Sequence, residues 1–474
     1  MGDEGAESNT NNNSLDTTSW SDYIAELKML GRIAAPMILV GALQYLQQTV
    51  SMVIVGHISQ LALTTVAIAT ALTNVTGFSV LYGMTGGLST LCGQAYGAGQ
   101  YPKLGTYTYS GVISLVLACP PICLLWAFTA HLLRLTGQDP VVSQRARDFS
   151  LWSIPALVGT AVVGPLTRFL QAQSVVVPML LTSAAAFGLH VLMSWILAYK
   201  VGMGDVSVAV AFGLATWLNA AALGLYVKCS AKFKETRAPF TWGALRGIPE
   251  FFQLGVPAAV MVCLKWWSME ILTLLSGHLP DPRLETSVLS VSLTITTLHL
   301  TIPLGLGVAV STRVANELGA GNPRSARLAV VVAVSIAVVE ASIVSIALFC
   351  ARHVVGYAFS SDPQVVSHMS TLIPLICVFV VMDSLQGVLS GTATGCGWQK
   401  VGVYMNLGAF YLVGLPLGCS LGFATRLQGN GFWIGIVAGS VVQALLLSVF
   451  TCFLDWNKQA SKARERVTTG SSSH

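Results

Sequence analysis

Long apolar segments follow one another along almost the whole chain, separated by short stretches that contain charged residues, Gly or Pro. A helix that crosses a membrane needs about 20 mainly apolar residues, and each segment is long enough. The pattern therefore predicts an all-α integral membrane protein with about twelve transmembrane helices. These cover residues 31–58, 61–85, 106–130, 149–170, 178–199, 206–227, 251–277, 286–311, 328–351, 366–392, 401–423 and 432–454.

The composition agrees with this interpretation. Of the 474 residues, 54% are hydrophobic and only 9% are charged, against roughly 25% charged residues in a soluble domain. The ten cysteines occur singly, without a CxxC pair or histidines at zinc spacing, so neither a disulfide framework nor a metal site is indicated. The sequence also has no nucleophile triad, HExxH motif or phosphate-cradling loop. We therefore expect neither an enzyme nor a cofactor.

The distribution of Lys and Arg predicts the orientation. With the N-terminus inside, 17 of the 25 Lys and Arg residues lie on the inner side and seven on the outer side, while Lys265 falls within a segment. Cytosolic loops carry the excess of positive charge, so we expect both termini in the cytosol. Residues 1–26 form a tail predicted to be disordered, residues 229–250 a basic connector, and residues 457–474 a second tail. The net charge of +5 reflects the basic cytosolic loops together with Lys265 and does not indicate a nucleic-acid partner.

A shift of 222 residues aligns similar sequences in the two halves of the chain. Identical pairs include Gly83 with Gly305, and residues 97–99 with residues 319–321 (both Gly-Ala-Gly). Gly-rich membrane sequences also match by chance, but Pro36 and Pro257 recur at almost the same shift. We therefore predict two six-helix lobes, residues 27–228 and 251–456, related by an internal repeat. Lobes with an even number of helices keep the same orientation, which suits a cavity between them and alternating access.

Polar side chains form stripes within the first two segments. Gln44, Gln47, Gln48 and Ser51 share one helical face, and Thr70, Thr73, Asn74 and Gly77 share another. Such stripes either line a water-filled cavity or form hydrogen bonds between helices, and the sequence favours neither. On the first interpretation, Gln44, Gln48 and Asn74 contact substrate.

Carboxylates within the segments occur only in the second half, as Glu270, Glu340 and Asp383. Asp383 begins a polar stripe that continues with Gln386, Ser390 and Thr394. Acidic groups inside a membrane often carry protons, so Asp383 is the first candidate for ion coupling, and a structural hydrogen-bond network is the alternative. Glu340 has no such stripe and is the weakest candidate.

The seventh segment places Lys265, Trp266, Trp267 and Glu270 close together in sequence. Lys265 and Glu270 lie about 140° apart on a helix, so they do not face the same partner. Trp266, Trp267 and Glu270 share a face, and a carboxylate beside aromatic rings suits an organic cation. Tryptophans at a membrane interface are an equally good interpretation.

Five motifs resemble those of plant members of the multidrug and toxic compound extrusion (MATE) family of secondary transporters. They are residues 91–98 (LCGQAYGA), 284–290 (LETSVLS), 311–322 (STRVANELGAGN), 386–391 (QGVLSG) and 395–399 (GCGWQ). The resemblance covers about residues 27–456. It implies two lobes in a V-shaped arrangement, antiport of organic solutes against protons, and a pair of acids in the C-lobe as the coupling site.

Two positions depart from the family pattern. The family usually has Glu where this chain has Lys265, and Glu where it has Ser89, whereas Glu270 and Asp383 match the remaining acids. Two outcomes are open. Either Lys265 pairs with Asp383, or coupling moves to Glu270 and Asp383 with a substrate preference shifted toward neutral or anionic compounds.

These observations together predict a proton-coupled antiporter that exports small organic compounds such as alkaloids, phenolics or xenobiotics. Lys265, Trp266, Trp267 and Gln386 complete the expected substrate cavity. We expect a functional monomer in the plasma membrane or the vacuolar membrane, with small organic solutes, protons and the lipid bilayer as its partners. The alternative is a passive anion channel or an uncoupled carrier on the same fold.

Overall fold

The computed structural model describes residues 19–276, 278–279, 282–359 and 362–469. Within these ranges helices are the only regular secondary structure, and twelve helical segments are long and apolar enough to cross a membrane. The prediction of an all-α protein with about twelve spans is confirmed.

The first six spans include four that are assembled from consecutive helical pieces. They are α1 (Trp20–Gly56); α2 (Gln60–Thr73) continued by the π-helix η1 (Asn74–Phe78) and α3 (Ser79–Gly97); α4 (Tyr101–Ala127); α6 (Pro140–Trp152) with α7 (Ile154–Ala172); α8 (Val177–Trp195) with η2 (Ile196–Lys200); and α9 (Ser207–Cys229) after η3 (Gly204–Val206). The short helix α5 (Thr129–Leu135) precedes α6.

The second six spans begin after a short connection that contains η4 (Ala231–Phe233) and α10 (Gly243–Arg246). They are α11 (Ile248–Ser276), α12 (Pro282–Ala320), α13 (Pro323–Cys350), α14 (Pro363–Cys396), the run of α15 (Gln399–Asn406), η6 (Leu407–Gly414) and α16 (Leu415–Ala424), and α17 (Gly429–Cys452). The short η5 (Val355–Ala358) precedes α14, and α18 (Trp456–Thr469) follows α17.

The ends of the chain are more ordered than the sequence suggested. Helix α1 begins at Trp20, inside the predicted tail, because Ser19 and Asp22 form a capping box that satisfies free N–H groups of its first turn. Residues 1–18 of that tail lie outside the described residues. At the other end, most of the tail predicted from residue 457 is the helix α18.

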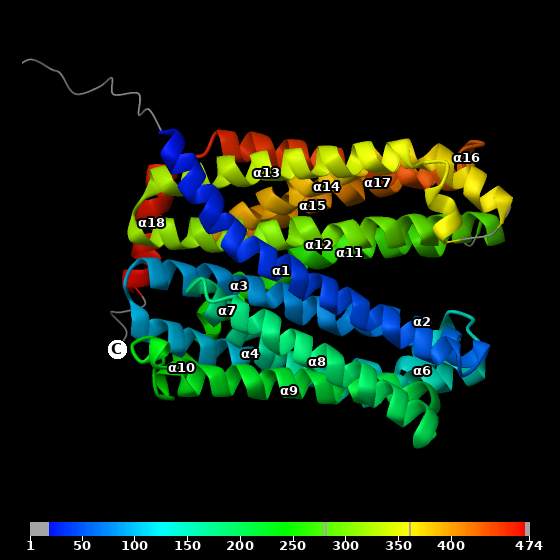
Figure 1. The fold of residues 1–474 in the computed structure, drawn as a ribbon, viewed down its shortest axis with the longest axis horizontal. Helices are drawn as coiled ribbons and strands as arrows, with labels where there is room; N and C mark the ends of the chain where they lie inside the picture. Colours follow the sequence, from blue (N-terminus) through cyan, green and yellow to red (C-terminus); the bar gives the residue numbers. More distant parts are fainter. Residues whose placement is uncertain (1–18, 277, 280–281, 360–361, 470–474) are drawn as a thin grey trace, which may run out of the picture.

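The two lobes lie side by side in Figure 1, with α2–α9 in the lower half and α11–α17 in the upper half. Helix α1 crosses diagonally between them, and α18 lies across the left end of the bundle, which we call the α18 end. The ends of α3 and α12 meet there. The first span of each lobe packs on the second span of the other lobe: α1 packs on α12, and α11 packs on α3.

Contacts between the lobes come in pairs that the repeat relates. Gly97 on α3 lies against the backbone of Asn316, and Gly319 on α12 lies against the backbone of Gln94. A shift of 222 residues converts one contact into the other. A Cβ atom at either glycine would overlap a carbonyl oxygen of the opposite helix, so only glycine permits this approach. The contact lies beyond the predicted end of the span at residue 85, because α3 continues to Gly97.

A second pair of contacts lies nearer the middle of the bundle. The position of a Cβ atom on Gly41 of α1 is 3.6 Å from the Thr301 side chain of α12. The related pair, Cys263 of α11 and Ser79 of α3, has its sulfur and oxygen atoms 3.6 Å apart. The internal repeat predicted from the sequence is therefore also a structural repeat about a pseudo-two-fold axis.

The hydrophobic core is shared at one end of the bundle and divided at the other. At the α18 end, one cluster of buried side chains includes residues of both lobes. Toward the opposite end the C-lobe has a cluster of its own, and so does the N-lobe. The three clusters include, in that order, Leu30, Leu91, Phe251 and Val314; Leu272, Val288, Phe379 and Trp433; and Ile54, Val66, Phe149 and Val208. The lobes are thus packed together at the α18 end and pack separately beyond it.

Candidate functional site

The centre of the C-lobe contains an ion pair between Lys265 on α11 and Asp383 on α14. The Asp383 side chain is 1% exposed and that of Lys265 is 12% exposed. The Lys265 ammonium also donates to Oε1 of Gln386, one turn further along α14. Of the two alternatives that the sequence left open for Lys265, the structure therefore has the pairing with Asp383. The second oxygen of that carboxylate, Oδ2, is buried and has no hydrogen-bond partner among the described residues.

The predicted polar stripe of α14 extends this pair toward the α18 end. Nε2 of Gln386 donates to Oγ of Ser390 at 2.8 Å, and Oγ1 of Thr394 donates to the Ser390 carbonyl at 2.9 Å. The Thr394 carbonyl accepts a hydrogen bond from Thr90 on α3. The stripe therefore links the Lys265–Asp383 pair to the contact between the lobes, and Gln386 lies within it as a buried residue.

Helix α18 contacts both lobes where this stripe ends. Nε2 of Gln94 on α3 donates to the Gly395 carbonyl on α14 at 3.1 Å, while its Oε1 accepts from Arg466 of α18. Nη2 of Arg464 donates to the Ala320 carbonyl at 2.8 Å, at the end of α12.

An ion pair between the lobes lies at the same end. The Arg313 guanidinium of α12 binds both carboxylate oxygens of Glu26 on α1, at 2.7 and 2.8 Å. It also lies 2.8 Å from Glu317 on its own helix. Bidentate contacts of this kind are the strong form of an Arg–carboxylate pair. Glu26 belongs to the segment that was predicted to be a disordered tail, and the structure places it in this pair instead.

A second buried polar cluster involves Glu340, the acid that the sequence ranked last. Nε2 of His299 on α12 lies 3.0 Å from Oε1 of Glu340 on α13. Oγ of Ser384 on α14 donates to Oε2 of Glu340 at 3.2 Å. The sequence reasoning sought partners on the same helix and missed His299 and Ser384, which come from other helices. The available signal was a histidine in the middle of a predicted span.

Trp267, one of the three residues of the cation site predicted on α11, contacts the N-lobe. Nε1 of Trp267 donates to the Val75 carbonyl of η1 at 3.2 Å, so this ring connects the two lobes, while Trp266 and Glu270 are half-buried. Within the described residues, Glu270 makes no hydrogen bond or ion pair, and Asp383 is paired with Lys265 instead.

Gln44 and Gln48 lie on a face of α1 between its contacts to the two lobes. On one side of them Gly41 packs on Thr301 of α12, and on the other side Ser51 Oγ lies 2.9 Å from His190 Nε2 on α8. Both glutamine side chains are exposed. The apolar side chains of Leu46 and Val53 are also exposed. Because successive residues of a helix are rotated by about 100°, these apolar side chains point in roughly the opposite direction from the glutamines. The glutamines therefore face the space between the lobes. Asn74 is half-buried.

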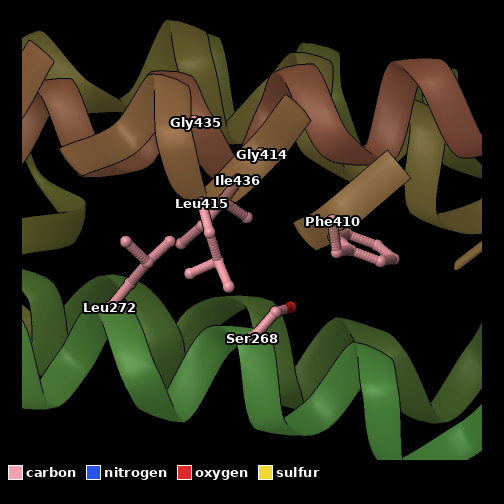
Figure 2. Close-up of a pocket in the computed structure, with 7 residues that line it drawn as sticks. All are labelled: Ser268, Leu272, Phe410, Gly414, Leu415, Gly435 and Ile436. Atoms are coloured by element: carbon pink, nitrogen blue, oxygen red, sulfur yellow. The ribbon is translucent and has the colours of Figure 1, made fainter. Parts of the chain in front are cut away.

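The side of α11 that faces α16 and α17 is closely packed. Figure 2 shows Ser268 and Leu272 of α11 opposite residues of η6, α16 and α17. The crevice between them measures about 10 Å³ and is lined by Ser268, Leu272, Phe410, Gly414, Leu415, Gly435 and Ile436. Such a volume holds one water molecule at most. This crevice is therefore too small for an organic solute.

Known proteins resemble this chain in sequence and in structure. The model of the MatE family matches residues 36–196 and again residues 257–419, so the two matches begin at Pro36 and Pro257. Protein DETOXIFICATION 14 of Arabidopsis thaliana is 47% identical over 445 residues, covering 94% of this chain and 92% of the relative. Protein DETOXIFICATION 12 of the same plant is 47% identical over 459 residues, covering 96% and 95%.

Solved structures give the same result. The crystal structure of the eukaryotic MATE transporter AtDTX14 has a TM-score of 0.90 at 47% identity, covering 94% of this chain and 100% of that one. An outward-facing multidrug resistance MATE transporter has a TM-score of 0.81 at 17% identity, covering 94% and 97%, which supports the fold alone. The two family matches agree with the repeated contacts of the two lobes, and the relatives are transporters rather than enzymes. The chain is a multi-pass membrane protein that belongs to the MATE family of transporters.

Proposed function

We propose that this protein exports small, mostly planar organic compounds from the cytosol in exchange for protons. The observation that carries the proposal is the buried Lys265–Asp383 pair, because charged groups inside a membrane are costly and usually functional. The names of the relatives, detoxification proteins, support xenobiotics, alkaloids or phenolics as substrates. The proposed location is the plasma membrane or the vacuolar membrane, and the proposed working unit is a monomer.

The two-lobed packing supports an alternating-access cycle. The excess of Lys and Arg in the connecting loops favours a cytosolic location for the α18 end and both termini. With this orientation, the shared core and the Glu26–Arg313 pair close the cytosolic side, while the lobes pack separately toward the outside. The structure then corresponds to an outward-facing state, in which substrate leaves and a proton enters.

The proton step acts on the Lys265–Asp383 pair. Oδ2 of Asp383 is buried and unpartnered, and a proton added there neutralises the carboxylate. Lys265 then loses its counter-charge and becomes a free ammonium close to the space between the lobes. Because the stripe from Gln386 to Thr394 connects this pair to α3, a change in the pair reaches the contact that closes the cytosolic side. Glu270 keeps its predicted role as a second proton carrier in this proposal.

Lys265 also bears on the choice of substrate. Because Asp383 is paired with Lys265, it offers no free carboxylate to hold a cation, and the lysine itself repels cations. We therefore propose that the substrates are neutral or anionic aromatic compounds. Gln44, Gln48 and Asn74 supply hydrogen bonds from the N-lobe, and Trp266 and Trp267 supply an aromatic surface from the C-lobe.

An uncoupled carrier or a passive anion channel is the competing function. The pair neutralises the acid that would otherwise carry the proton, and this favours a carrier without coupling. A channel is a poor fit, because backbone contacts at Gly97 and Gly319 close the α18 end. An uncoupled carrier differs from an antiporter in one measurable property, the response of transport to a pH gradient.

Transport by the purified protein in liposomes tests the proposal. Uptake of a planar organic anion, fluorescein, and a planar organic cation, ethidium, is followed by fluorescence with and without an imposed pH gradient. Protein-dependent uptake that accelerates with the gradient, with fluorescein preferred to ethidium, is the expected result. Uptake that proceeds at the same rate without a gradient contradicts proton coupling and supports the uncoupled carrier.

A further inference from the structure

The Glu340 carboxylate is held inside the C-lobe by two polar side chains, those of His299 and Ser384. His299 Nε2 lies 3.0 Å from its Oε1, and Ser384 Oγ donates to its Oε2 at 3.2 Å. The exposed fraction is 4% for the His299 side chain and 17% for that of Glu340, and Ser384 is fully buried. Nδ1 of His299 is buried without a partner among the described residues, so a proton there would be an unsatisfied donor. The arrangement is satisfied best by a neutral imidazole with its proton on Nε2.

Glu340 differs in this respect from Asp383, whose charge is compensated by Lys265. Among the described residues no Lys or Arg forms an ion pair with Glu340, whose hydrogen-bond partners are His299 and Ser384. The helices packed around the cluster carry other ionisable groups, of which Asp383 directly precedes Ser384. The nearest in sequence are Arg32 and Tyr45 on α1; Lys265 and Glu270 on α11; Glu285 and Arg313 on α12; Arg327 and Cys350 on α13; His368, Cys377, Asp383 and Cys396 on α14; and Cys452 on α17.

We propose that Glu340, together with His299 and Ser384, is a further proton-binding site of the C-lobe, in addition to Asp383 and Glu270. In the proton-free state the carboxylate accepts hydrogen bonds from both partners. A proton from the acidic side adds to Oε2, the cluster changes from one negative charge to none, and the new O–H donates to Ser384 Oγ. A serine hydroxyl both donates and accepts, so Ser384 reverses its hydrogen bond without moving. The bond from His299 Nε2 to Oε1 is kept.

The position of the cluster links it to the proposed transport cycle, on which this role rests. Ser384 follows Asp383 directly in α14, and neighbouring residues on a helix point about 100° apart. The same turn of α14 therefore contacts the Lys265 pair on one side and the Glu340 cluster on another. Proton binding at Glu340 removes an uncompensated charge between α12, α13 and α14, so it favours a different packing of these helices.

Infrared spectroscopy tests the proton-binding site without any substrate. Difference spectra of the purified protein in lipid are recorded while the pH is lowered, and the C=O stretching band of protonated carboxyl groups is followed. We expect a band that is absent in Glu340→Gln and retained in Asp383→Asn, the matched change at the neighbouring buried acid. Ser384→Ala and His299→Gln shift its frequency, because each removes a hydrogen bond to the carboxyl group.

Two infrared results overturn the site: spectra in which Glu340→Gln removes no carboxyl band, or a frequency of the Glu340 band that neither Ser384→Ala nor His299→Gln changes. Gradient-driven uptake of fluorescein and ethidium separates this inference from the proposed function. If the unmodified protein ignores the gradient although the Glu340 band is present, antiport is wrong and the site remains. If the unmodified protein follows the gradient and Glu340→Gln does so equally, the site takes no part in coupling. The expected result is uptake at least tenfold slower in Glu340→Gln.

Discussion

Lys265 on α11 and Asp383 on α14 form a buried ion pair at the level where the two lobes stop sharing a core. Loss of one member of such a pair leaves an uncompensated charge in a medium of low dielectric constant, whereas loss of both members leaves none. Variants that lack one member of the pair should therefore be much less stable than variants that lack both members.

Asp383→Asn should lower the stability of the protein by about 3–5 kcal/mol, because the Lys265 ammonium stays buried without a counter-charge. The double variant Lys265→Gln/Asp383→Asn should recover most of this loss. Thermal melting of the purified proteins in detergent measures both effects. A double variant that is no more stable than Asp383→Asn would show that the ion pair does not determine stability here.

The same variants test coupling. Asp383→Asn should abolish gradient-driven transport while the protein stays folded, and the double variant should not restore it, since neither has a carboxyl group at position 383. Uptake into liposomes with an imposed pH gradient measures this loss, with size-exclusion chromatography as the control for folding. Undiminished transport by Asp383→Asn would refute the assignment of this residue.

Lys265→Glu should raise the transport of organic cations relative to anions, because it changes the charge of the site by two units next to the space between the lobes. Ethidium uptake should increase and fluorescein uptake should decrease, each by roughly tenfold or more. A tenfold change corresponds to a free-energy difference of about 1.4 kcal/mol. Lys200→Glu makes the same charge change on η2 of the N-lobe and serves as the control. Equal selectivity of the two variants would exclude Lys265 from substrate choice.

Gly97→Ala should prevent close packing at the α18 end, because its Cβ atom would overlap the carbonyl oxygen of Asn316. The expected cost is about 1–3 kcal/mol, or a shift toward the state that is open at this end. Thiol labelling of Cys92 on α3, in a variant whose other cysteines are replaced by serine, should accelerate. Gly188→Ala is the control, since a Cβ atom there meets no neighbour within 4 Å. Equally slow labelling in both variants would contradict a closing role for Gly97.

Arg466→Ala should weaken the contact of α18 with both lobes, because its guanidinium donates to Gln94, which in turn donates to the Gly395 carbonyl. Removal of a charged donor from a buried acceptor costs about 1–3 kcal/mol. Labelling of Cys92 in the same background should therefore be faster than in Lys462→Ala, which changes an exposed residue of α18. If the two variants label at the same rate, α18 does not hold the lobes together.

The sequence by itself determined the number of spans, the repeat and the presence of unusual charges in the C-lobe. Apolar length fixes how many helices cross a membrane, since no other element except a closed barrel satisfies its backbone there. The repeat was visible as shared glycines because close contact between helices tolerates no other residue at positions such as Gly97 and Gly319. The polar stripe from Asp383 to Thr394 was also visible, because helical periodicity places its members on one face.

The tertiary structure alone decided which charges meet. Helical periodicity relates residues of one helix and is silent about neighbours on another, so it could offer the Lys265–Asp383 pair only as one of two outcomes. It overlooked His299 and Ser384 as partners of Glu340 for the same reason, because the three side chains come from three helices. It also assigned Glu26 to a disordered tail, because the attraction of Arg313, which lies 287 positions away, leaves no local pattern in the sequence.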